Sequence, residues 1–251
     1  MVDFLPHYSL LQWYVLCGCA ILVGITKTGI PGVGILCVPL LAMAFPARMS
    51  TGLMLPMLAI ADIFAVVYYR RYANWKIILR LLPWALAGVS IGAIAIHYID
   101  DSELRPLIGI IILILLTLNY IYQHYWNKQD RIPSHWSFSV SMGLAAGLMS
   151  QLANAAGTVM VIYLLSMRLQ KNDYIGTSAW FFLILNWLKM PLFIMDGRVN
   201  ALSIKADLIT LPFIMIGVLA GILILKKMPT KLFNTIIQLL AIASAVKLTL
   251  S

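Results

Sequence analysis

Charged residues are scarce in this sequence. Asp, Glu, Lys and Arg make up 11% of its 251 residues, whereas hydrophobic residues make up 62%. The mean hydropathy is +0.92. An average soluble domain carries about a quarter charged residues, so the composition excludes a soluble protein. No polar linker separates one part from another, and residues 1–251 are therefore predicted to form a single membrane domain with no soluble catalytic domain.

Cysteines and enzyme motifs are equally sparse. The three cysteines, Cys17, Cys19 and Cys37, lie inside apolar runs, and their odd number argues against a disulfide framework. The sequence has no H-E-x-x-H motif, no P-loop and no paired carboxylates at catalytic spacing. We therefore expect no enzyme activity, no metal and no other cofactor. The thiols leave one alternative open, a membrane-embedded thiol-dependent protein that handles a sulfur compound.

Long apolar runs dominate what is present. A membrane-spanning helix needs about 17 to 25 apolar residues. Six segments meet this requirement: Thr51 to Tyr69, Ile77 to Ile99, Pro106 to Tyr122, Tyr174 to Met195, Leu208 to Leu225, and Leu232 to Leu250. The class predicted from this pattern is an all-α, multi-pass integral membrane protein.

Two further apolar regions are interrupted. In the first, the short runs Leu10 to Val23 and Ile35 to Phe45 flank the Gly-rich stretch Gly24 to Gly34. The second extends from Phe138 to Leu169, with Ser150 to Gly157 at its centre. Non-helical backbone at membrane depth is tolerated only where protein buries it or where it lines a cavity. Both regions are predicted to be broken helices or re-entrant hairpins.

The chain also repeats itself. Pro83, Gly88 and Gly92 recur 129 residues later as Pro212, Gly217 and Gly221. The two interrupted regions recur in the same order. Internal duplication is common in transporters, and it predicts two repeats here, one over about 9–125 and the other over about 137–250, each with a broken hairpin and three transmembrane helices.

Loop charges predict how the repeats are oriented. If each interrupted region enters and leaves on one side, one face collects 11 basic and two acidic residues: Arg70, Arg71, Lys76, Arg80, Lys128, Arg131, Arg168, Lys171, Lys226, Lys227 and Lys231, against Asp130 and Asp173. The other face has Arg48, Arg105, Arg198, Lys205 and Lys247 against Asp3, Asp100, Asp101, Glu103, Asp196 and Asp207. Basic loops mark the cytoplasmic side. The repeats are therefore predicted to be inverted, with both termini periplasmic, and the net charge of +9 indicates topology rather than nucleic-acid binding.

Three charged residues remain within the membrane: Lys27, Lys189 and Asp62. Charges at this depth are costly and are functional candidates by default. Lys27 lies in the first break, where glycines free backbone N–H groups and a helix restarting at Ile35 would direct its positive end to the same point. This combination predicts an anion site, to which we assign Lys27, Thr28, Gly29, Gly32 and Gly34. The alternative is a Lys27 that extends to the membrane surface.

The second break supplies polar groups without charge. Inverted repeats bring their breaks together near the midplane, so Gln151, Asn154, Gly157 and Thr158 are predicted to complete the substrate pocket. Asp62 and Lys189 occupy corresponding positions in the two halves, and we expect them to form a pair. Lys189 would then be a second anion ligand, with Asn186 one turn before it, and Asp62 a release switch or proton carrier. The alternatives are a pair that only neutralises itself and polar groups in the second break that only hydrogen-bond between helices.

These features resemble the TauE/SafE sulfite exporter family. The resemblance rests on Gly32-Val-Gly34 followed by Pro39-Leu-Leu, on Ala73-Asn-Trp75 leading into Pro83, and on Gly176-Thr-Ser178 with Asn186 and Gly197. It covers the chain from about Leu16 to Val246. It implies a permease of the bacterial inner membrane, with a duplicated core, for sulfite, sulfonates or related sulfur anions. The second break departs from the family pattern because it has few glycines. We therefore expect the first half to contribute most of the anion binding.

We therefore expect a secondary transporter or facilitator that exports a sulfur oxyanion. Its expected partners are the small anion and the lipid bilayer, with protons added if transport runs inward and Asp62 must couple it. Besides the thiol-dependent protein, a non-transporting assembly subunit of a membrane complex remains an alternative. The pattern leaves the oligomeric state open.

Overall fold

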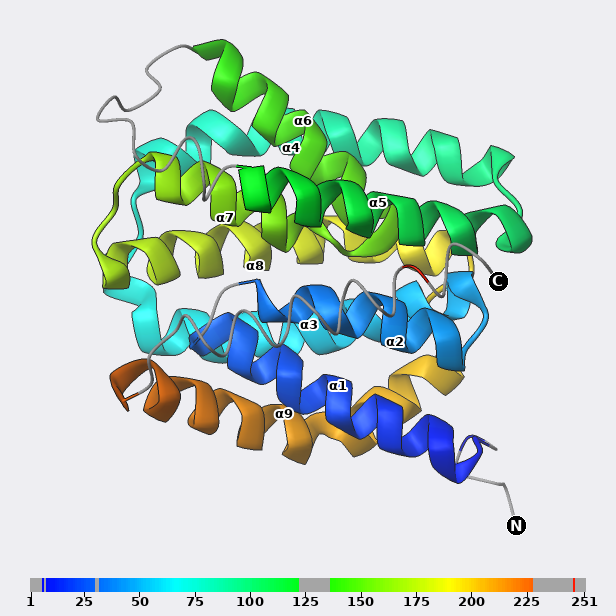
Figure 1. The fold of residues 1–251 in the computed structure, drawn as a ribbon. Coiled ribbons are helices and arrows are strands. Elements are labelled where there is room, and N and C mark those ends of the chain that lie inside the picture. The colour runs from blue at the N-terminus through cyan, green and yellow to red at the C-terminus, as the bar shows by residue number, and fades with distance from the viewer. Residues whose placement is uncertain (1–5, 7, 30–31, 122–135, 228–245, 247–251) are drawn as a thin grey trace.

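The computed structural model describes residues 6, 8–29, 32–121, 136–227 and 246, with backbone only for residues 119 and 224–227. This part of the chain is helical and has no strand (Figure 1). Its α-helices are α1 (Leu10–Thr28), α2 (Cys37–Ala44), α3 (Ala47–Tyr69), α4 (Trp75–Ala95), α5 (Asp101–Ile121), α6 (Trp136–Ala153), α7 (Ala156–Ser166), α8 (Lys171–Met195) and α9 (Ala201–Lys227). Short 3-10 helices cover Val33–Leu36, Arg70–Tyr72 and Ile96–Tyr98.

The first hairpin consists of α1 and α2. The Ser9 hydroxyl caps α1 by accepting from the N–H of Gln12, and Oε1 of Gln12 accepts from the N–H of Ser9. Nε2 of the same Gln12 donates to the carbonyl oxygen of Ala44 at 2.9 Å. Because Gln12 lies in the first turn of α1 and Ala44 ends α2, the hairpin begins and ends on the same side.

The second hairpin, α6 and α7, closes in the same way. The hydroxyl groups of Ser139 and Tyr163 lie 3.0 Å apart, and the ring of Phe138 stacks on that of Tyr163. The start of α6 is thus beside the end of α7. The hairpin geometry predicted for both interrupted regions is present.

The first arm is longer than its sequence predicted. We expected an apolar run too short to cross a membrane, ending at Val23, but α1 continues to Thr28 and is long and apolar enough to do so. The extension packs on α9, because Gly24 contacts the backbone of α9 directly and the Thr28 hydroxyl donates to the carbonyl oxygen of Val218. Helical structure also resumes earlier than expected, as a 3-10 turn from Val33 rather than a helix from Ile35.

Within the part of the chain that the structure describes, five helices are long and apolar enough to span a membrane: Leu10–Thr28, Ala47–Tyr72, Trp75–Tyr98, Lys171–Met195 and Ala201–Leu223. The last four contain or largely contain predicted spans, and α5 covers the predicted span that begins at Pro106. The sixth predicted span, Leu232 to Leu250, lies outside the described residues except for Val246.

The helices pack in three levels. In Figure 1, α4 and α6 lie at the top, α3 and α8 in the middle, and α1 and α9 at the bottom. Both outer pairs are in close backbone contact at glycines. A Cβ atom at Gly217 of α9 would overlap the carbonyl oxygen of Ile21 in α1, and one at Gly147 of α6 would overlap that of Ala85 in α4. Small residues permit such close helix contacts in membranes.

The order of elements also repeats. A hairpin followed by two long helices appears as α1–α2, α3 and α4, and again as α6–α7, α8 and α9. Each hairpin packs against the second long helix of the other half, because α1 contacts α9 and α6 contacts α4. The inverted repeat stays a prediction, and this reciprocal packing is what it would produce.

Candidate functional site

A cavity of about 60 Å³ lies where the two hairpin breaks face each other. Lys27, Gly32 and Gly34 line it from the first hairpin, and Asn154, Gly157 and Thr158 line it from the second. Asn186 of α8 also reaches it. A space needs roughly 10–15 Å³ by this measure to hold one water molecule. The cavity therefore has room for a few waters or for an oxyanion of similar size.

Lys27 forms the charged wall of this cavity. Its Nζ atom lies 2.7 Å from Oδ1 of Asp62 and 4.1 Å from the centre of the Phe182 ring. The side chain of Lys27 is only 8% exposed, and that of Asp62 is fully buried. The second oxygen of Asp62 accepts from Nδ2 of Asn186 at 2.7 Å. The carboxylate thus holds Lys27 and Asn186, which both line the cavity, in fixed positions.

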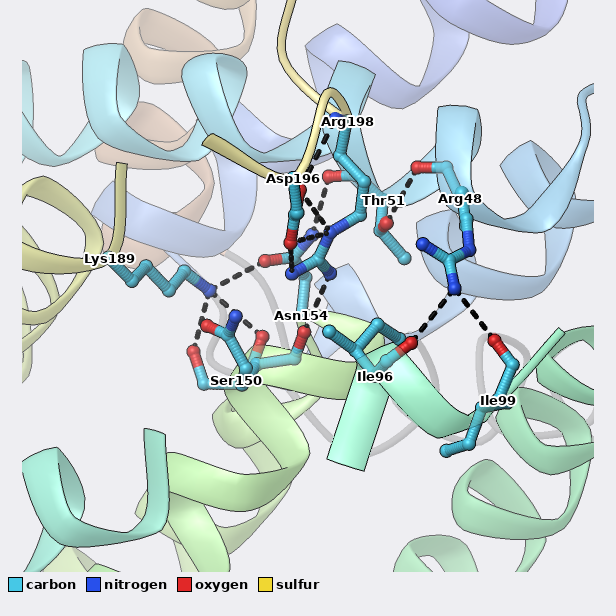
Figure 2. A network of polar contacts seen from close by, with 10 residues as sticks. Arg48, Thr51, Ile96, Ile99, Ser150, Asn154, Lys189, Asp196 and Arg198 are labelled. Atoms are coloured by element: carbon cyan, nitrogen blue, oxygen red, sulfur yellow. Dashed lines mark hydrogen bonds and ion pairs between the residues drawn. The ribbon is translucent and has the colours of Figure 1, made fainter. Parts of the chain in front are cut away.

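Lys189 has a different set of partners, all of them neutral (Figure 2). Its Nζ atom donates to the carbonyl oxygen of Ser150 at 2.9 Å, to the Ser150 hydroxyl at 2.7 Å and to Oδ1 of Asn154 at 2.6 Å. Ser150 lies in the last turn of α6, whose terminal carbonyl groups lack helical partners and attract cations. Lys189 therefore places its amine group against two residues that line the cavity, Ser150 and Asn154.

The predicted pairing of Asp62 with Lys189 is wrong. Asp62 pairs with Lys27 instead. The reason is the extension of α1, which places Lys27 in the last turn of a helix packed against α3. Lys189 is directed to the end of α6, where it shares the carbonyl oxygen of Ser150 with the N–H of Asn154.

Asn154 joins the second break to two neighbouring elements. Its backbone is left-handed, with φ of 53°, a conformation that Asn tolerates better than most residues. Its side chain accepts from Lys189 and donates through Nδ2 to the carbonyl oxygen of Thr51 at 2.8 Å. Asn154 thus makes the sharp turn at a position where the sequence has no glycine.

Three predicted ligands lie in helix interfaces instead of lining the cavity. The Thr28 hydroxyl donates to the carbonyl oxygens of Gly24 and Val218. Gly29 packs against the backbone of Gly221. Gln151 is fully buried against Gly92, and neither its side-chain nitrogen nor its oxygen has a hydrogen-bond partner.

Arg198 is a third buried cation, beside Lys27 and Lys189, that the sequence pattern did not indicate. We assigned it to a surface loop, but it is 3% exposed and packs 3.5 Å above the Phe193 ring. It pairs with Asp196 and donates through Nη1 to the carbonyl oxygen of Gln151 at 2.9 Å (Figure 2). Burial lowers the pKa of Arg198, and the hydrogen bonds that it donates to Asp196 oppose this shift. The spacing of Asp196 and Arg198 around a glycine was the signal available in the sequence.

The cysteines lie apart from the cavity. Cys19 and Cys37 are buried between α1 and α2, and Cys17 is half-buried. Across the described ranges, no group of three or more His, Cys, Asp and Glu side chains could hold a metal ion. The polar groups that line the cavity are lysine, amide, hydroxyl and glycine backbone groups, which suit an anion, and the rest of the lining is largely apolar.

Comparison with known proteins gives one match. The family model for sulfite exporter TauE/SafE matches residues 16–248. No curated protein and no solved structure matches the chain at a significant level. The match covers both hairpins and the helices that pack against them.

Proposed function

Because the chain belongs to the TauE/SafE sulfite exporter family, we propose that it exports a small sulfur oxyanion, sulfite or an organosulfonate, through the cavity between its two hairpins. In this proposal the protein is a secondary transporter or facilitator of the bacterial inner membrane. It forms one membrane domain of two inverted repeats, with both termini in the periplasm. The basic loops around Arg70, Arg168 and Lys226 then face the cytoplasm.

The observation that carries the proposal is the charge around the cavity. Lys27 and Asp62 neutralise each other, whereas Lys189 meets only neutral acceptors among the described residues. When Lys189 is protonated, the two lysines and one carboxylate leave one uncompensated positive charge. A buried charge without a counter-ion is costly. A monovalent anion in the cavity would supply that counter-ion.

The lining also offers the hydrogen bonds that an oxyanion needs. We assign Lys27, Asn186 and Thr158 as direct hydrogen-bond donors to the anion. At Gly32, Gly34 and Gly157 the anion can approach the backbone closely. Lys189 acts as the second cation. It acts on the anion through Ser150 and Asn154, or contacts the anion directly after these two side chains turn away. Hydrogen bonds between charged groups are the stronger ones, so the two lysines dominate affinity.

Export requires no ion partner in an inside-negative cell. Each negative charge that leaves gains about 2.3 kcal/mol per 100 mV of membrane potential. Uptake would work against the same potential. A facilitator built around one site is therefore sufficient for outward flux.

The test is flux and binding with purified protein in liposomes. Sulfite, sulfate, thiosulfate, sulfoacetate and taurine are compared in the wild type and in Lys27→Ala, Lys27→Arg and Lys189→Ala. The matched control is Lys76→Ala, which removes an exposed lysine far from the cavity in sequence. We expect saturable sulfite or sulfonate flux that Lys27→Ala and Lys189→Ala abolish, that Lys27→Arg retains in part and that Lys76→Ala leaves unchanged.

Two outcomes would contradict this proposal. Wild-type protein that carries none of these anions would reject the transport proposal and favour the assembly-subunit alternative. Flux that is indifferent to both lysines would place the anion route elsewhere in the molecule.

A further inference from the structure

Asp207 of α9 is a buried carboxyl group without a partner among the described residues. It is 2% exposed, and neither of its side-chain oxygens has a hydrogen-bond partner. We assigned it to a surface loop from its sequence, and that assignment is wrong because α9 begins at Ala201 and turns this position inward. An ionised carboxylate in such a place is strongly disfavoured. In this conformation the group is therefore expected to carry a proton.

A second unpartnered group lies nearby. The Tyr8 hydroxyl is buried and has no hydrogen-bond partner. Gly217 contacts Ile21 and Gly221 contacts Thr28, so α1 and α9 run in the same direction, and Asp207 near the start of α9 lies beside the start of α1, which Tyr8 precedes. Burial raises the pKa of the Tyr8 phenol, and Asp207, when ionised, raises it further. Tyr8 packs against Trp13 of α1 and against Phe45, which follows α2. Asp207 thus faces the open end of the first hairpin, which is the end where α1 begins and α2 ends.

The charged groups on the elements next to α9 have partners other than Asp207. α9 packs against α1 and α3. On these helices, Lys27 pairs with Asp62, and the Arg48 guanidinium donates to the carbonyl oxygens of Ile96 and Ile99. In the loop before α9, Arg198 pairs with Asp196. Lys205 on α9 itself makes no hydrogen bond to Asp207, since both carboxyl oxygens lack one.

We propose that Asp207 is a proton-binding site whose loading and release couple anion transport to a proton gradient. The inference rests on the proposed transport function and adds a coupling ion to it. The link is α1, which has Tyr8 just before its first turn and Lys27 in its last. Its 19 residues span about 28 Å at 1.5 Å per residue.

The mechanism follows from the α1–α9 contact. Protonated Asp207 is compatible with the close packing of α1 on α9 at Gly217 and Gly221. Once ionised, the carboxylate needs water, and water can reach it only if the open end of the hairpin separates from α9. That movement shifts α1 and, with it, the Lys27 ammonium at the cavity. Asp62 is a poorer proton carrier, because Lys27 and Asn186 already stabilise its charge.

The first test uses a pH gradient in liposomes at zero membrane potential. Methanesulfonate is the probe because its charge does not change near neutral pH. For one proton per anion, its internal-to-external ratio should change about tenfold per pH unit, which corresponds to about 1.4 kcal/mol. Asp207→Asn keeps the size of the protonated group, and its ratio should stay near one while flux down a concentration gradient continues. The matched control, Glu103→Gln, removes an exposed carboxylate and should behave as the wild type.

A second readout separates this inference from the transport proposal. Difference infrared spectroscopy across a pH titration should show the carbonyl stretch of a protonated carboxyl group, and Asp207→Asn should lack it. This signal does not require anion flux. An unchanged infrared band in Asp207→Asn, pH-driven accumulation that survives in Asp207→Asn, or accumulation driven by a sodium gradient instead would each overturn the proton site.

Discussion

The ammonium group of Lys27 lies 2.7 Å from the carboxylate of Asp62, and the pair closes one wall of the cavity between the hairpins. Lys27 ends α1, whereas Asp62 lies in the middle of α3. The contact therefore fixes the tip of the first hairpin to a helix at the centre of the bundle. It also leaves Lys189 as the buried cation that has only neutral partners.

Removing Lys27 alone should destabilise the protein. Lys27→Met leaves the Asp62 carboxylate buried without its cation, and breaking a buried pair in this way costs about 3–5 kcal/mol. The double variant Lys27→Met with Asp62→Asn removes both charges and should recover most of that loss. Thermal unfolding in detergent measures both. Neither variant should bind sulfite, and a single variant as stable as the wild type would contradict the pairing.

Replacing Asn154 by Asp should weaken anion binding without removing either lysine. The new carboxylate would lie at the position of Oδ1, 2.6 Å from Nζ of Lys189, and would neutralise it. Opposite charges at about 4 Å interact by about 4 kcal/mol at an effective dielectric constant of 20. We expect the sulfite affinity to fall at least about tenfold, measured by calorimetry. Asn154→Ala loses both side-chain hydrogen bonds without adding charge, so its affinity should fall less; equal losses would rule out the charge argument.

Glycine contacts between α1 and α9 should limit side-chain size. Gly217→Ala places a methyl group against the carbonyl oxygen of Ile21, and overpacking of this kind costs about 1–3 kcal/mol. Gly18 of α1 has open space around it and serves as the control. Gly18→Ala should be neutral or stabilising by up to about 1 kcal/mol, since Ala favours helix. Denaturation midpoints compare the two, and similar values would mean that α1 and α9 are less closely packed.

The cysteines should be dispensable for transport. Cys19 and Cys37 are buried against each other's carbonyl groups, away from the cavity lining. Such cysteines behave as small apolar residues. The variant with Cys17, Cys19 and Cys37 all replaced by Ala should retain sulfite flux in liposomes. Loss of flux in a variant that remains folded would support the thiol-dependent alternative.

Much of the candidate site could be predicted from local pattern. Lys27, Gly32 and Gly34 were assigned together because glycines beside a lone charge in an apolar run indicate a helix break near an anion. Asn154, Gly157 and Thr158 were assigned from the second break, and all six line one cavity. Thr28, Gly29 and Gln151 were assigned by proximity in sequence alone. They lie in helix interfaces because neighbouring residues on a helix point in different directions.

Burial near helix ends was harder to predict. Arg198 and Asp207 lie close to the boundaries of apolar runs, where a sequence pattern indicates surface loops. The structure buries both, because the loop after α8 folds over Phe193 and the first turns of α9 pack beside Tyr8. Neither contact is local in sequence.

The sequence by itself determined the class of the protein, the hairpin breaks and the positions at which charge enters the membrane, since hydropathy, glycine and proline act locally on the backbone. Only the tertiary structure decided that Asp62 pairs with Lys27, that Lys189 meets the end of α6 and that Asp207 has no partner. A buried charge is stabilised by whichever group lies within a few ångströms. Which group that is depends on how the helices pack, as α1 does on α9 and α6 on α4.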